Sequence, residues 1–184
     1  QFCIFPQRTD DGCAIIFYKL YDTYYYNFEL GTFLILLFMT LDATLYDHPP
    51  NGLILIYDMD GMGLMHMTRL RVGYLKTYFQ YLQEALPVKL KSIHILNSVY
   101  FIEKVMKLIR PLARQDILNL MHFHTSNMDM EIFYKQYIPR KCLPEEYGGD
   151  LPTVRELHGK TIEKLTDLQS HFDAEELQRH NVDS

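Results

Sequence analysis

Residues 52–58, GLILIYD, constrain the fold more than any other segment of the chain. Their apolar side chains do not alternate with polar ones, so neither face of a strand formed here could lie in water. Continuous apolar strands of this kind are typical of parallel sheets, in which helices cover both faces. The segment therefore predicts an α/β fold with a buried central strand.

Segments with strand and helix character alternate along the rest of the chain, and prolines stop several of the helices. Strands are also expected at 13–20, 89–97 and 116–124, and helices at 27–48, 64–86, 100–112 and 128–138. This alternation predicts one α/β domain with a mixed, mostly parallel sheet flanked by helices. After Gly149 the sequence becomes more polar, and residues 156–184 are expected to form an acidic, helical tail.

Composition excludes several classes of protein. The chain has 184 residues and a net charge of −5, which argues against a general nucleic-acid binder because phosphate contacts need a basic surface. Its three cysteines are an odd number at unrelated spacings, which favours a reducing cytoplasm over a disulfide framework. The longest apolar run, 33–39, is far shorter than the roughly 20 residues that span a bilayer.

Asp58 and Asp60 follow the apolar strand 52–58 and resemble the Asp-x-Asp-Gly motif of magnesium-dependent phosphatases. That motif usually continues with a threonine, but Met62 follows the glycine here. A later acidic pair is also needed for the metal, and Val154 stands where its second carboxylate should be. The two aspartates are better interpreted as polar groups that organise a tight turn.

His122 and His124 stand two positions apart on an expected strand, so they point to one face. Two histidines make half of a metal site, and a hydrogen-bonded structural pair is the favoured interpretation. The sequence has no glycine-rich nucleotide motif after a strand, so nucleotide binding is not suggested, and it has no nucleophile elbow. Its 14 Tyr, 11 Phe and nine Met suit a large core, and they also suit a pocket for an apolar ligand.

Four sequence blocks carry a family resemblance: GLILIYDMDGMGLMH, LPVKLKSIHILN, LIRPLARQDILNLMHFH and IPRKCLPEEYGGDLP. Together they resemble the CRAL-TRIO lipid-binding domain, and within it the group of α-tocopherol transfer and cellular retinaldehyde-binding proteins. The likeness runs from about residue 10 to residue 155. HILN followed by LPEEYGG about fifty residues later is specific as a combination, whereas neither block is specific alone.

The resemblance implies a sheet that floors a hydrophobic cavity, roofed by a mobile gate helix at 100–112. It implies a non-enzymatic carrier that binds and transfers one small hydrophobic lipid, without a cofactor or metal. Members of the family begin with a helical bundle that this chain lacks, so residues 1–155 are expected to be the lipid-binding domain alone. The alternative is a regulatory or scaffold module with protein partners and a vestigial cavity.

The resemblance also assigns the wall of the cavity. The expected ligand-contacting residues come from both layers of the fold: Ile35, Met39, Leu53, Tyr57, Leu64, Tyr78, Leu82 and Ile93, with Phe101, Ile102, Val105 and Ile109 on the gate. Ile35 and Met39 replace small hydroxyl residues of the tocopherol carrier. A retinoid, a carotenoid or a fatty chain is therefore at least as good a candidate as tocopherol.

A basic patch that binds phosphoinositide headgroups is the last feature implied by the resemblance. Lys89 and Lys91 match two members of this patch, but Asp116 and Leu120 stand where two further cations are expected. We therefore expect weak phosphoinositide binding at a transiently contacted membrane. Docking would depend mainly on an exposed apolar edge of the gate, formed by Phe101, Ile102 and Ile109.

Overall fold

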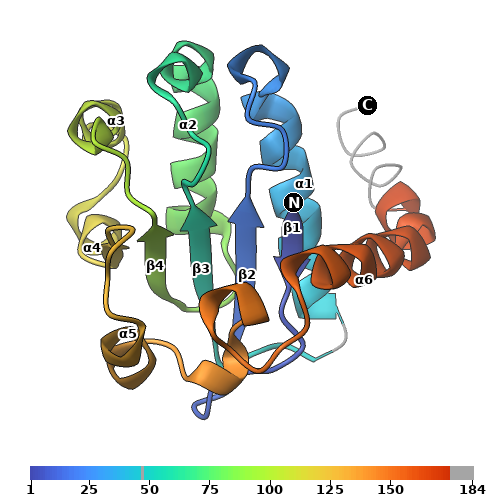
Figure 1. Cartoon of the computed structure of the whole chain (residues 1–184). Helices are drawn as coiled ribbons and strands as arrows, with labels where there is room; N and C mark the ends of the chain where they lie inside the picture. Colours follow the sequence, from blue (N-terminus) through green and yellow to red (C-terminus); the bar gives the residue numbers. More distant parts are fainter. Residues whose placement is uncertain (47, 175–184) are drawn as a thin grey trace.

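A five-stranded mixed sheet forms the centre of the computed structural model, which describes residues 1–46 and 48–174 (Figure 1). The strands follow one another in sequence order: β1 (Phe2–Ile4), β2 (Cys13–Lys19), β3 (Gly52–Asp58), β4 (Leu90–Leu96) and β5 (Met121–Phe123). Strands β2 to β5 are parallel, and β1 pairs antiparallel with β2 at one edge. The predicted α/β class and the mostly parallel sheet are confirmed.

Helices cover both faces of the sheet. On one face lie α1 (Leu30–Tyr46), α2 (Val72–Gln80) and α3 (Ile102–Ile109), and on the other lie α5 (Met130–Gln136) and α6 (Val154–Asp167) (Figure 1). Alternate side chains of each strand enter different cores, so Leu55 packs towards α1 and α2, whereas Ile56 packs towards α5 and α6. This double coverage explains why β3 contains no alternating polar residues.

Two expected elements differ from the structure. The predicted helix 64–86 is divided into a 3-10 helix (Leu64–Arg69), α2 and a π-helical turn (Tyr81–Ala85), with an extended backbone at Arg71. The predicted strand 116–124 was wrong in its first half, where α4 (Gln115–Leu118) precedes the short strand β5. Asp116 in the first turn of α4 suits a helix start, because a carboxylate there interacts favourably with the free backbone N–H groups.

Strand β1 lies at an edge of the sheet and was not predicted, since three residues are too few to show a period. Helix α6 packs against its outer side. The backbone N–H of Phe2 donates to His158 Nδ1 at 3.3 Å, and that of Ile4 donates to Thr161 Oγ1 at 2.9 Å. Side chains of α6 thus accept hydrogen bonds from backbone N–H groups at the edge of the sheet. The remainder of the expected tail, 175–184, lies outside the described residues.

Short 3-10 turns also lie at Tyr25–Asn27, Arg140–Cys142 and Glu145–Tyr147, and residues 169–174 continue the chain after α6 as helix. Within residues 1–46 and 48–174, no helix combines the length and the apolar character needed to cross a bilayer.

Candidate functional site

A cavity of about 170 Å³ lies between the sheet and the layer formed by α1, α2 and α3. Its floor comes from β2, β3 and β4, whose side chains on this face belong to the larger core. The connection after β3 and the end of β5 complete the wall. The main lining residues are Tyr18, Tyr57, Ile93 and Ile95 on the floor, Leu30, Phe33 and Leu34 from α1, Leu75, Tyr78 and Phe79 from α2, and Ile102, Val105, Met106 and Ile109 from α3.

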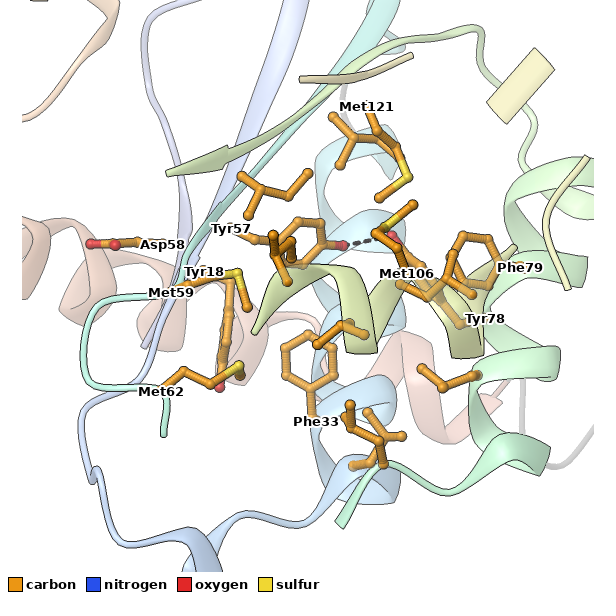
Figure 2. Close-up of a pocket in the computed structure, with 18 of the residues that line it drawn as sticks. Tyr18, Phe33, Tyr57, Asp58, Met59, Met62, Tyr78, Phe79, Met106 and Met121 are labelled. Atoms are coloured by element: carbon orange, nitrogen blue, oxygen red, sulfur yellow. Dashed lines mark hydrogen bonds between the residues drawn. The ribbon is translucent and has the colours of Figure 1, made fainter. Parts of the chain in front are cut away.

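The wall is apolar and aromatic except for a few tyrosine hydroxyls. Tyr57 on β3 and Tyr78 on α2 meet inside the cavity, where their hydroxyl oxygens are 2.8 Å apart (Figure 2). Burial raises the pKa of both phenols, so both stay neutral. Asp58 also borders the cavity, but its carboxylate projects away from it (Figure 2). The site therefore suits a ligand that is apolar over most of its surface.

The structure places half of the twelve expected ligand-contacting residues in the wall of this cavity. Strands β3 and β4 each contribute one of these residues, because every second side chain of a strand faces the helices. Helix α3 contributes three from its apolar side. The six are Tyr57, Tyr78, Ile93, Ile102, Val105 and Ile109.

The other six lie outside the wall. Leu53, Leu82 and Phe101 are buried in the surrounding core, and Met39 is half-buried. Ile35 is 61% exposed and Leu64 is 38% exposed, so both face water. Because α1 is apolar around most of its circumference, its sequence does not show which side faces the sheet. Contact of these residues with a ligand stays a prediction.

Sequence reasoning missed several lining residues. Tyr18 pairs with Tyr57 across β2 and β3, so the register of two parallel strands could have placed it beside the expected floor. Four of the nine methionines also line the cavity, and the high methionine content was the available signal for them. They are Met59, Met62, Met106 and Met121.

Asp58 is held in a buried polar network. Its carboxylate accepts hydrogen bonds from the Tyr147 hydroxyl, from Asn97 Nδ2 at 2.7 Å and from the backbone N–H of Asp60 at 3.0 Å. Lys19 Nζ lies 3.0 Å from the same carboxylate. Burial alone would raise the pKa of Asp58, but these hydrogen bonds outweigh it and hold the pKa below its usual value. The interpretation of Asp58 and Asp60 as an organised turn is confirmed by this geometry.

The two expected strand histidines belong to a cluster with His94 of β4. His94 Nδ1 lies 3.0 Å from His124 Nε2, and the His122 ring stacks on His94 with centroids 5.1 Å apart. Phe133 and Tyr137 of the α5 region pack around these rings. Within the part of the chain that the structure describes, no group of three His, Cys, Asp or Glu is arranged to hold a metal ion. The cluster is a hydrogen-bonded element of the core.

The two lysines assigned to the basic patch are exposed, and one of them has an acidic neighbour. Lys89 and Lys91 both face water, and Lys91 Nζ lies 3.4 Å from Asp11. Asp116 pairs with Arg114 at 2.9 Å, so a cation offsets part of its charge locally.

The expected apolar edge of the gate needs correction. Phe101 is only 3% exposed, and Ile102 and Ile109 are half-buried. The exposed side of α3 instead carries charged residues, which include Glu103 and Lys107. In this structure the apolar side of α3 is turned mainly into the cavity.

Comparison with known proteins gives the same fold and a family. The chain is 22% identical over 148 residues to human alpha-tocopherol transfer protein-like, covering 79% of this chain and 42% of that protein. It is 28% identical over 134 residues to human clavesin-2, covering 73% of this chain and 38% of that protein. The structure of Sfh5 superposes with a TM-score of 0.56 at 14% identity, covering 85% of this chain and 57% of that one.

The chain thus spans less than half the length of these two curated relatives. A family model, the CRAL/TRIO domain, matches residues 1–149, which include all five strands and the whole cavity. CRAL/TRIO domains generally bind hydrophobic ligands, as the apolar wall would allow. By this match over most of its length, the chain belongs to the CRAL/TRIO domain family.

Proposed function

We propose that the protein is an intracellular carrier that binds and transfers one small hydrophobic lipid in its internal cavity. The observation that supports this function best is the apolar and aromatic wall between the sheet and three helices. A lipid that buries on the order of 400 Å² of surface would gain roughly 10 kcal/mol at about 25 cal/mol per Å², before entropy costs. Such a gain allows tight binding without an ionic contact. Retinoids, carotenoids, tocopherols and fatty chains are the candidate ligands.

Helix α3 is the proposed gate. The cavity of about 170 Å³ is smaller than the roughly 300–1,000 Å³ of most small-molecule pockets, so a lipid would require it to widen. Helix α3 has only eight residues, and Val105 and Ile109 on its inner side line the cavity. We expect its amides to exchange with solvent faster than those of the central strand β4, and to slow when lipid is bound. Equal protection of the two elements would place the entrance elsewhere.

The same small volume favours a second candidate function. A regulatory or scaffold module with protein partners would need no room for a ligand, and the cavity would then be vestigial. Organic extraction of the purified chain, followed by mass spectrometry, distinguishes the two functions. One lipid per chain supports the carrier. A chain that contains no lipid, and takes none up from vesicles, contradicts the carrier and favours the module.

A further inference from the structure

We propose that the hydrogen-bonded hydroxyls of Tyr57 and Tyr78 are the polar recognition element of the cavity, and that they select a neutral lipid that ends in one oxygen. A terminal aldehyde or alcohol meets this description, whereas a carboxylate and a pure hydrocarbon do not. The inference rests on the proposed carrier function and narrows its ligand to a chemical class.

The first argument is where the pair lies. Tyr57 comes from the centre of the sheet and Tyr78 from α2, so the two hydroxyls approach each other from opposite walls (Figure 2). Their oxygens are 2.8 Å apart, a normal distance for one O–H···O hydrogen bond. Both rings line the cavity. A ligand in the cavity therefore meets this pair beside otherwise apolar surface.

The second argument is an inventory of donors. Two phenols carry two O–H groups, and one of these is used when one hydroxyl donates to the other. Among the described residues, neither oxygen has a further partner, so one O–H remains without an acceptor. Leaving a buried donor unsatisfied is costly, and a carbonyl or hydroxyl oxygen of a ligand would satisfy it. The pair therefore favours a ligand that offers one acceptor oxygen to the free O–H group.

The third argument concerns charge. Among the residues that the structure describes, no Lys, Arg or His contributes to the wall. Asp58, the charged residue at its border, has its carboxylate in the network with Tyr147 and Asn97 on the other side of β3. A ligand carboxylate would therefore be buried without a cation, at a large desolvation cost. Burial raises the pKa of both phenols, which keeps them neutral donors but offers no positive charge.

The test offers the 184-residue chain four ligands with the same sixteen-carbon chain but different ends: hexadecane, hexadecanol, hexadecanal and palmitate. Bound lipid is measured by extraction and mass spectrometry after incubation with vesicles that contain one of them. We expect hexadecanol and hexadecanal to bind about tenfold more tightly than hexadecane, the equivalent of about 1.4 kcal/mol. Palmitate should bind more weakly than either.

Two conservative variants and one control locate the effect. Tyr57→Phe and Tyr78→Phe each keep the ring but remove a hydroxyl, and the double variant should bind hexadecanol no better than hexadecane. Tyr81→Phe is the matched control, because Tyr81 is a half-buried tyrosine that follows α2 but lies outside the cavity wall and outside the pair. The control should keep the tenfold preference.

The outcomes separate the inference from the carrier function. Uptake of hexadecane together with no preference for hexadecanol would overturn the role of the pair and leave the carrier intact. Tightest binding of palmitate, or a preference that survives in the double variant, would do the same. Uptake of none of the four by the wild-type chain would overturn the carrier, and the inference with it.

Discussion

The hydroxyl of Tyr147 donates a hydrogen bond to the carboxylate of Asp58, although the two residues are 89 positions apart in the sequence. Asn97, at the end of β4, donates to the same carboxylate and adopts a left-handed backbone with φ of 50°. These three residues lie in the blocks LILIYDMDG, HILN and LPEEYGG. The sequence blocks that carry the family resemblance therefore converge on one buried carboxylate, which is structural.

Replacing Asp58 by Asn should destabilise the fold. The amide keeps the shape but would present a donor towards Asn97 or Tyr147, so at least one buried partner loses its acceptor. Losses of this kind cost about 1–3 kcal/mol, and we expect a shift of that size in urea unfolding. Asp116→Asn is the control, because it breaks an exposed ion pair with Arg114 and should change stability far less. Equal effects of the two substitutions would contradict a structural role for the network.

Acid should destabilise the protein through His94. Burial, followed by the neighbouring His124 and His122, lowers the pKa of His94 from 6.5 to about 3. In the unfolded chain the His94 imidazole is therefore protonated below pH 6.5, whereas in the folded chain it stays neutral down to about pH 3. Stability should fall as pH falls through this window, with a limiting slope of about 1.4 kcal/mol per pH unit.

His94→Gln tests the assignment, because Gln keeps hydrogen-bonding groups but cannot titrate. The free energy of unfolding of each protein is measured above pH 6.5 and again between pH 6.5 and 3. The decrease between the two should be smaller for His94→Gln than for the wild type. His48→Gln, at an exposed position, should keep the wild-type dependence. An unchanged slope in His94→Gln would assign the acid sensitivity to other groups.

Filling the cavity should reduce lipid binding without unfolding the protein. Val105→Phe places a larger apolar side chain on the inner side of α3, where space is available. We expect a severalfold loss of bound lipid, measured by extraction, while the melting temperature stays close to that of the wild type. Ile35→Phe is the control, because Ile35 is exposed and outside the wall. An equal loss in Ile35→Phe would support the original expectation that Ile35 contacts the ligand.

Membrane attraction by the lysines should be weak and sensitive to salt. Lys89 and Lys91 contribute about 1 kcal/mol each at most near an anionic surface, and Lys91 already lies beside Asp11. Flotation with vesicles should therefore show slight phosphoinositide-dependent binding that disappears at high salt. Strong, headgroup-specific binding that is lost in the double variant Lys89→Ala/Lys91→Ala would show that two lysines suffice.

The sequence predicted the strands better than the cavity wall, for a physical reason. Strand β3 begins and ends where expected, and its two-residue period put Leu53, Leu55 and Tyr57 on one face. The family resemblance assigned Tyr57 and Ile93 to the cavity wall, and both line the cavity. The resemblance also assigned Val105 of α3, which lines the cavity as well. Helix α1 is apolar on nearly every side, so no period could show that Ile35 faces water.

The features that the sequence did not predict depend on contacts between segments far apart in the chain. The break between the 3-10 helix Leu64–Arg69 and α2 depends on tertiary packing, and so does the meeting of Tyr57 with Tyr78. Neither follows from the local sequence. The edge strand β1 was missed because its three residues acquire their pairing only beside β2.

The hydrogen bonds from β1 to α6 have a practical consequence for anyone who shortens this chain. A protein cut after residue 149, where the family match ends, would lose both His158 and Thr161. The backbone donors of Phe2 and Ile4 would then face solvent along an open strand, and open strands recruit further chains into intermolecular sheets. The segment that covers the edge strand of this sheet thus lies beyond the segment by which its relatives are recognised.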